Sequence, residues 1–268
     1  MIDRRRFLLT SLARAFQEGP QDLATNSSRS TPVQAHSARR SEPPTARRAA
    51  TVCLLLLLLI EISATFGETP PRRTCLPISE RAGRDVGCWL IVAEPLGRLT
   101  SSAVFWHLDT YPTRAAAEAA KGPRGTVVDA LGKVWLFTIG EAGWRPSGGV
   151  RVAEVGPIFV KSGEEYSVQY AEGVSNPGDV TPKHRHPGPE AWYTTTGGFC
   201  AEASDGKTYV GTAGQGIVIQ ADDTGWSMMT LIATGTEIRR SVYVVLHQSA
   251  HHWTAPASEW TPQGLCEK

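Results

Sequence analysis

Two histidines and one glutamate stand close together in this chain, and their spacing suits a divalent metal. His184 and His186 are separated by one residue. If residues 180–186 are extended, side chains alternate between two faces, so both imidazoles share one face. The Pro-Gly-Pro sequence at 187–189 predicts a turn, after which Glu190 opens the next strand beside the imidazoles.

This ligand set indicates which metals would bind. Two neutral imidazoles and a carboxylate are the set used by non-haem Fe(II), and the same donors suit Mn(II), Ni(II) or Zn(II). Arg185 must point to the opposite face. Trp192 and Tyr193 follow on alternate faces, so one of them is expected to look into the protein interior. They are candidates for stacking on a substrate, with ordinary core aromatics as the alternative.

The surrounding run resembles the first motif of the cupin superfamily. That motif is Gly, five residues, His-x-His, three residues, Glu, six residues, Gly. Every position is filled, by Gly178, His184, His186, Glu190 and Gly197. The resemblance implies a jelly-roll β-barrel in which the two histidines and the glutamate are metal ligands.

The second cupin motif, which supplies a fourth ligand in the family, is degenerate here. The family pattern is Gly, five residues, Pro-x-Gly, two residues, His, and it should fall in residues 214–225. In an ungapped alignment, Gln220 takes the place of the proline, Asp222 that of the second glycine and Gly225 that of the histidine. A short insertion would bring Met228 or Met229 to the last place instead. Neither alignment supplies a histidine, so the expected site has three protein ligands, more open positions and weaker metal binding.

Apolar runs and turn signals predict a mainly β fold. From Arg151 onward, short apolar runs recur every 8 to 12 residues between turn signals, which is typical of a sandwich or barrel. We expect strands near 152–160, 166–172, 180–186, 190–196, 198–203, 207–211, 216–221, 227–233 and 240–247. Upstream, we expect strands at 86–93 and 103–108, a helix at 113–121 and a strand region at 127–139 broken by Gly132.

These elements suggest four parts. Residues 1–67 read as an unfolded extension, because they carry nine arginines against five acids and no sustained periodicity. Residues 68–149 are expected to form a small α+β segment, with a degenerate second barrel half as the alternative. The Pro-Ser-Gly-Gly sequence at 146–149 separates this segment from a cupin barrel at 150–250. Residues 251–268 are a C-terminal tail.

The extension holds an export-like signal. Arg47 and Arg48 precede an apolar run at 49–60, and small residues follow up to Gly67. Cleavage after Gly67 would give an exported periplasmic or secreted protein. The run is short for a membrane span, and the alternative is an uncleaved N-terminal anchor.

Cysteine usage agrees with an oxidising compartment. Cleavage would remove Cys53 and leave four cysteines, an even number that allows three connectivities. The favoured pairs are Cys75 with Cys88 and Cys200 with Cys266. The alternative is four thiols, which would fit a cytosolic protein.

Several function classes are excluded. The net charge of +1 divides into +4 for residues 1–67 and −3 for the remainder. This charge distribution does not resemble that of a nucleic-acid-binding protein. The chain lacks G-x-S-x-G, G-x-x-x-x-G-K and H-E-x-x-H, which argues against hydrolase elbows, phosphate loops and zincin proteases. The expected partner is a small molecule, and by analogy with cupins a second copy of the chain could form a homodimer.

Two hypotheses about function remain. The first is a metal-dependent enzyme, such as a cupin oxygenase or isomerase, acting on an oxygen-rich substrate. The second is a non-catalytic exported binding protein without a bound metal. His247, His251 and His252 lie near the C-terminus, where a tail that folds back could supply a fourth ligand, although a surface cluster is the alternative.

Overall fold

The computed structural model describes residues 75–267, and the structural statements below concern these residues. The extension at 1–67, with its export signal and Cys53, lies outside the described residues, as do residues 68–74. Among the residues described, none of the helices is both long enough and apolar enough to cross a membrane.

The chain is built mainly of strands, which confirms the predicted fold class. In chain order the elements are β1 (Leu76–Pro77), the 3-10 helix η1 (Ile78–Glu80), β2 (Gly87–Arg98), β3 (Ala103–Tyr111), α2 (Arg114–Ala120), β4 (Gly125–Ala130), β5 (Lys133–Gly140), β6 (Val150–Phe159), β7 (Glu165–Ser175), β8 (His184–His186), β9 (Glu190–Thr196), β10 (Gly198–Ala203), β11 (Thr208–Thr212), β12 (Gly216–Ile219), β13 (Ser227–Thr234), β14 (Arg239–Gln248) and β15 (Ala255–Pro256).

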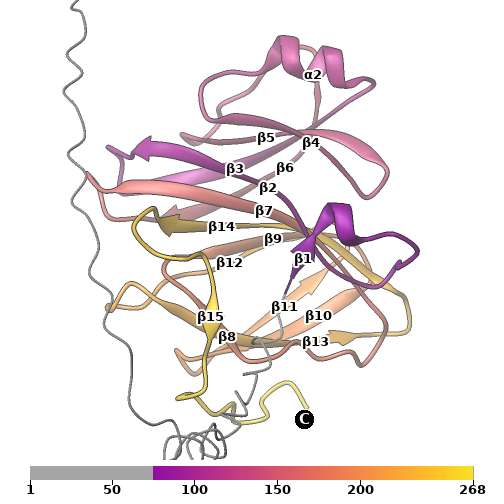
Figure 1. Ribbon diagram of the computed structural model, residues 1–268, viewed down its shortest axis with the longest axis vertical. Helices are drawn as coiled ribbons and strands as arrows, with labels where there is room; N and C mark the ends of the chain where they lie inside the picture. The colour runs from indigo at the N-terminus through magenta and orange to yellow at the C-terminus, as the bar shows by residue number, and fades with distance from the viewer. Residues whose placement is uncertain (1–74, 268) are drawn as a thin grey trace, which may run out of the picture. The chain divides into compact units, whose positions relative to one another are not determined.

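The strands form three sheets, which Figure 1 shows as layers. A six-stranded sheet has the order β1-β2-β7-β14-β9-β12, and a five-stranded sheet has the order β11-β10-β13-β8-β15. These two sheets make the jelly-roll barrel that the first motif implies. A four-stranded sheet, β4-β5-β3-β6, lies on the other side of the six-stranded sheet and carries α2.

Side-chain alternation gives the six-stranded sheet two buried faces. On β9, Ala191 and Tyr193 pack toward the four-stranded sheet, whereas Trp192 packs inside the barrel. On β14, Val242 packs in the core between the six-stranded and four-stranded sheets, and Tyr243 packs in the core inside the barrel. A strand in a sheet that is covered on both faces has a continuous apolar sequence. For this reason residues 242–246 show no alternation of apolar and polar residues.

The turn at 146–149 does not separate two sheets, contrary to the expected boundary at 149/150. Strand β6 follows this turn, yet it pairs with β3 in the four-stranded sheet. Strand β2 precedes the turn, yet it pairs with β7 in the barrel sheet. The glycine-rich turn is part of the connection that carries the chain from β5 across β3 to β6, because β5 and β6 flank β3. Turn composition marks such a loop and a domain boundary equally well.

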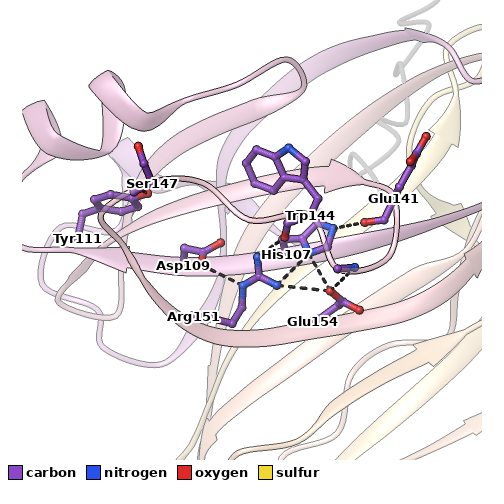
Figure 2. A network of polar contacts seen from close by, with 9 residues as sticks. His107, Asp109, Tyr111, Glu141, Trp144, Ser147, Arg151 and Glu154 are labelled. Carbon is purple, nitrogen blue, oxygen red and sulfur yellow. Dashed lines mark hydrogen bonds and ion pairs between the residues drawn. The ribbon is translucent and has the colours of Figure 1, made fainter. Parts of the chain in front are cut away.

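A polar network fastens this connection to the sheet (Figure 2). Arg151 Nε donates to Asp109 Oδ1 at 2.9 Å, and Arg151 Nη1 contacts His107 Nδ1 at 3.1 Å. The other ring nitrogen, His107 Nε2, lies 2.9 Å from the carbonyl of Glu141. His107 is fully buried, and this burial, followed by the nearby Arg151 charge, lowers its pKa. The network therefore holds a neutral histidine at the base of the loop.

Strand bounds otherwise follow the sequence pattern closely. The main exception is the first ligand strand, expected at 180–186. Strand β8 spans only His184–His186, and Val180 forms an isolated bridge with Ile232. Pro182 lies between these two pairings and has no backbone N–H to donate, so it interrupts the ladder.

Candidate metal centre

A tight turn between β8 and β9, which belong to different sheets, places the three predicted ligands. Strand β8 pairs with β13, so that His184 lies opposite Met229 and His186 opposite Ser227. At the turn, the backbone of Gly188 lies against β14: an added Cβ would be 1.9 Å from the carbonyl oxygen of Leu246. Ser227 Oγ also donates to the Gly188 carbonyl at 2.8 Å. Only glycine fits this turn, which returns the chain so that Glu190 faces the histidines.

The ligand atoms of His184, His186 and Glu190 all lie within 4.8 Å of one another. His186 Nε2 and Glu190 Oε2 are 3.3 Å apart, and the two imidazole rings are 4.9 Å apart between centroids. His186 is 0% exposed and Glu190 is 2% exposed, whereas His184 is half-buried. The sequence prediction of a shared face is confirmed, with one side of the cluster open.

Each histidine is oriented through its other ring nitrogen. His184 Nδ1 lies 2.8 Å from the carbonyl of Pro182, and His186 Nδ1 lies 2.8 Å from the carbonyl of Trp253. A carbonyl accepts only, so both rings carry hydrogen on Nδ1 and leave a lone pair on Nε2. The indole of Trp253 also stacks on His186 at 5.6 Å between centroids.

The donor set fits a bound cation. Within the described residues, His186 Nε2 and Glu190 Oε2 are buried without a hydrogen-bond partner. Buried polar atoms are normally satisfied, and a cation bound to both of these atoms would satisfy them. Burial, followed by the neighbouring His186, lowers the pKa of His184 to about 4. His184 is therefore neutral at neutral pH and does not need to lose a proton before binding a metal.

Arg185 points out of the barrel, as the alternation predicted. Its guanidinium carbon lies 4.7 Å from the Trp226 ring centroid, and its Nη1 donates to Glu259 at 2.6 Å. The side chain thus joins β8 to the C-terminal tail and stays away from the ligands.

A cavity of about 300 Å³ adjoins the ligands inside the barrel. His184, Glu190 and Trp192 contribute to its wall. The rest of the lining is largely apolar and includes Val86, Val174, Met229, Leu231, Tyr243 and the pair Cys75 and Cys88. This size and this mixture of apolar walls with few polar groups suit a small molecule.

Tyr193 does not line this cavity, so its prediction as a substrate-binding residue is wrong. It packs in the core between the six-stranded and four-stranded sheets. The reason is the strand period: Trp192 and Tyr193 are consecutive on β9, and Trp192 takes the face toward the barrel.

The degenerate second motif has structural roles. Gln220 accepts from the backbone N–H of Phe159 at 3.0 Å and donates to the carbonyl of Pro157 at 2.8 Å. Asp222 Oδ1 accepts from the backbone N–H of Thr224 at 2.8 Å, which closes a turn. Met229 is the residue of this region that reaches the cavity, opposite His184. Of the three residues that the alignments offer for the fourth ligand place, Gly225, Met228 and Met229, Met229 is the one that lines the cavity.

The tail folds back on the site, but its histidines do not join it. Strand β15 pairs with β8, and the tail contributes the Trp253 carbonyl that orients His186. His251 and His252 are exposed. His247 is buried, with Nδ1 facing the Gln248 carbonyl at 3.1 Å. The metal-type cluster found in the described residues contains His184, His186 and Glu190 alone.

The cysteines form the two favoured pairs. Cys75 is joined to Cys88 with a Cα–Cα distance of 4.6 Å, and Cys200 to Cys266 with a distance of 5.7 Å. The first pair borders the cavity, where the Tyr243 hydroxyl contacts both sulfurs. The second pair ties the tail to β10.

Two further residues of the site were missed by sequence reasoning. Arg239 and Tyr243 both line the cavity, and both are buried. Burial raises the pKa of the Tyr243 hydroxyl, which is neutral as a result. The one signal in the sequence was Arg239 itself, a charged residue at the start of the apolar run that forms β14. A charged residue in such a place more often marks a strand end exposed to solvent.

Comparisons with known proteins give solved structures only. No family model matches this chain, and no curated protein matches it. An oxalate oxidase structure matches with 21% identity and a TM-score of 0.28, covering 34% of this chain and 46% of that chain. A cupin-like protein from Thermotoga maritima matches with 18% identity and a TM-score of 0.30, covering 37% of this chain and 68% of that chain.

A conserved protein with a double-stranded β-helix domain from Klebsiella pneumoniae matches with 18% identity and a TM-score of 0.29. That match covers 42% of this chain and 84% of that chain. The chain spans less than half the length of the oxalate oxidase that it matches.

Proposed function

We propose that this protein is an exported cupin that holds a divalent transition metal on His184, His186 and Glu190 and binds a small oxygen-rich molecule in the adjoining cavity. The observation that supports this most strongly is the pair of buried atoms His186 Nε2 and Glu190 Oε2, which lie 3.3 Å apart and have no hydrogen-bond partner among the described residues. Removing both atoms from water without a hydrogen bond is costly unless a cation takes the place of the water.

The chain's own groups prepare this site. The Pro182 and Trp253 carbonyls hold the two rings with Nε2 toward the cluster, which keeps the geometry before metal arrives. Trp192 and other apolar residues form the cavity wall next to the ligands. When bound, a divalent ion would supply Lewis acidity or dioxygen activation to the molecule in the cavity. Oxygenase or isomerase chemistry is the proposed class.

Metal content tests the proposal directly. Protein purified anaerobically and reconstituted with Fe(II), Mn(II), Ni(II) or Zn(II) is expected to carry one ion per chain by mass spectrometry. His186→Ala and Glu190→Ala are expected to lose most of this metal, because two remaining ligands hold an ion much less tightly. Circular dichroism on the same samples checks that the barrel still folds.

A matched control separates ligand loss from general damage. His251 is exposed on the tail, so His251→Ala should keep its metal. If wild-type protein binds none of the four ions, the metal-dependent hypothesis is rejected. The second candidate is then a metal-free binding protein. Met229 favours this candidate, because the residue paired with His184 on β13 is a methionine and not a fourth histidine.

Export is the remaining part of the proposal. The charge order around residues 47–67 supports it, and the two cysteine pairs are compatible with an oxidising compartment. A second copy of the chain as partner is proposed by analogy with cupins alone.

A further inference from the structure

Arg239 is a buried cation in the wall of the cavity. It opens strand β14, and only 3% of its surface is exposed. Its backbone lies against the connection between β9 and β10: a Cβ on Gly197 would lie 2.8 Å from the Cα of Arg239. Gly197 has a φ of +65°, so this close approach requires glycine. The last glycine of the first motif thus places Arg239.

The guanidinium has no anionic partner within the described part of the chain. None of the ion pairs among residues 75–267 includes Arg239. Its Nε is buried without a hydrogen-bond partner. The contact that holds the group is the face of Phe199, 4.8 Å from the guanidinium carbon to the ring centroid. A buried charge without a partner is unfavourable, so the position calls for a ligand that supplies the counter-charge.

Arg239 stays charged under ordinary conditions. Burial lowers its pKa to about 10, while Tyr243 and Glu190 act in the opposite direction. The cavity therefore contains a full positive charge at neutral pH. Its other charged wall residues are Glu190, which faces the histidines, and Asp179, which accepts a hydrogen bond from the backbone N–H of Asn176 at 2.7 Å.

Charge balance and donor count indicate the class of ligand. With a divalent ion on the three ligands, the ion and Arg239 outweigh the two carboxylates, so the cavity attracts an anion. Arg239 is the one Lys or Arg side chain in the cavity wall. A single planar guanidinium matches a singly charged carboxylate bidentately, whereas a phosphate group usually gathers several cationic or backbone donors.

We propose that the cavity binds a small carboxylic acid as its anion, with the carboxylate on Arg239 and a second oxygen group directed toward His184 and Glu190. The proposal rests on the proposed function for its metal part and names the substrate class of the same site. The 300 Å³ volume limits the ligand to a small organic acid. Arg239 acts as a binding and orienting residue through its direct contact with the ligand.

Calorimetric titration with a matched pair of probes tests this proposal. Lactate and its uncharged isostere lactamide are titrated into Mn(II)-loaded and metal-free protein, and inorganic phosphate is a third probe. We expect lactate to bind Mn(II)-loaded protein at least about tenfold more tightly than lactamide. Arg239→Met should abolish this difference while leaving Mn(II) content unchanged.

Two variants make the result specific. Arg240→Met removes the neighbouring arginine of β14, which does not line the cavity, and should leave lactate binding as in the wild type. Arg239→Lys keeps the charge without the planar fork, and should bind lactate more weakly than the wild type but still prefer it to lactamide. If Arg239→Met does not fold, this lysine variant carries the test.

The outcomes separate this proposal from the proposed function. If the wild type binds no metal, the metal hypothesis fails, and the preference of metal-free protein for lactate over lactamide, lost in Arg239→Met, still supports the carboxylate site. Equal binding of lactate and lactamide, tighter binding of phosphate than lactate, or unchanged lactate binding in Arg239→Met would overturn the proposal.

Discussion

At the scale of single residues, the buried histidines His107 and His186 differ in the partners of their ring nitrogens. The His107 network and the ligand cluster both contain buried charged or titratable groups. In the network, His107 contacts a guanidinium through one ring nitrogen and a carbonyl through the other. In the cluster, Nε2 of His186 has no hydrogen-bond partner among the described residues, and neither has Nε of the nearby Arg239. Both ring nitrogens of His107 are therefore satisfied by the protein, whereas Nε2 of His186 beside Glu190 is free to bind a cation.

The lowered pKa of His107 predicts an acid-sensitive fold. Its pKa lies below 6.5 in the folded state and near 6.5 in the unfolded chain, so the unfolded chain binds more protons in the interval between them. The free energy of unfolding of metal-free protein should therefore fall as pH decreases from about 6.5 toward the folded pKa. Urea titrations at successive pH values measure this slope.

His107→Asn provides the comparison, because it removes the titrating group and keeps a polar side chain. Its urea midpoint should be lower at pH 7, because contacts of the network are lost, and should depend less on pH below 6.5. His252→Asn is a control at an exposed position and should match the wild type. An unchanged slope in His107→Asn would contradict the assignment.

At the scale of elements, local spacing predicted the ligands, while strand pairing decided their surroundings. His184, His186 and Glu190 lie within seven residues, so alternation and one turn suffice to bring them together. The carbonyl that orients His186 comes from Trp253, 67 residues away, through the pairing of β15 with β8. Arg239 reaches the cavity because β14 lies between β7 and β9. Sheet order of this kind depends on long-range packing, which periodicity along one strand does not encode.

The same limitation explains the boundary predicted at 149/150. Composition correctly indicated a loop at 146–149, and strands were expected on both sides of it. Which sheet each strand joins was not predictable, since the apolar pattern of a strand does not specify its pairing partner. Relative to the expected boundary, the two strands have opposite memberships: β2 pairs within the barrel sheet and β6 within the four-stranded sheet.

The C-terminal tail is predicted to tune metal affinity. A chain ending at residue 252 loses the Trp253 carbonyl, so the His186 ring is no longer held. Loss of such an outer contact typically costs about 10–100-fold in metal affinity. The control is a chain ending at residue 257 with Cys200→Ser, which keeps Trp253 and β15 but loses the second cysteine pair.

Competition against a chelator measures the Mn(II) affinity of both truncated forms. The shorter chain should bind Mn(II) at least about tenfold more weakly than the control chain. Equal affinities would mean that the Trp253 carbonyl does not support the site.

At the scale of the whole molecule, the two cysteine pairs hold parts that the sheets alone secure weakly. Cys75–Cys88 attaches the two-residue strand β1 to β2, beside the cavity. Cys200–Cys266 attaches the last residues to β10, and Glu202 on the same strand accepts from the backbone N–H of Leu265 at 2.9 Å. Segments this short contribute little packing, so covalent closure of the unfolded chain should carry much of their stability.

Counting thiols tests the export proposal and the pairing together, because Cys53 lies in the part of the chain that cleavage after Gly67 would remove. Protein isolated from its native host is denatured without reductant, alkylated and weighed intact. We expect a mature chain that begins near Glu68 and carries no alkylated thiol, since all four remaining cysteines are paired. An uncleaved anchor would give the longer mass with one alkylated thiol, from Cys53. A full-length mass with five alkylated thiols would place the protein in a reducing compartment and reject export.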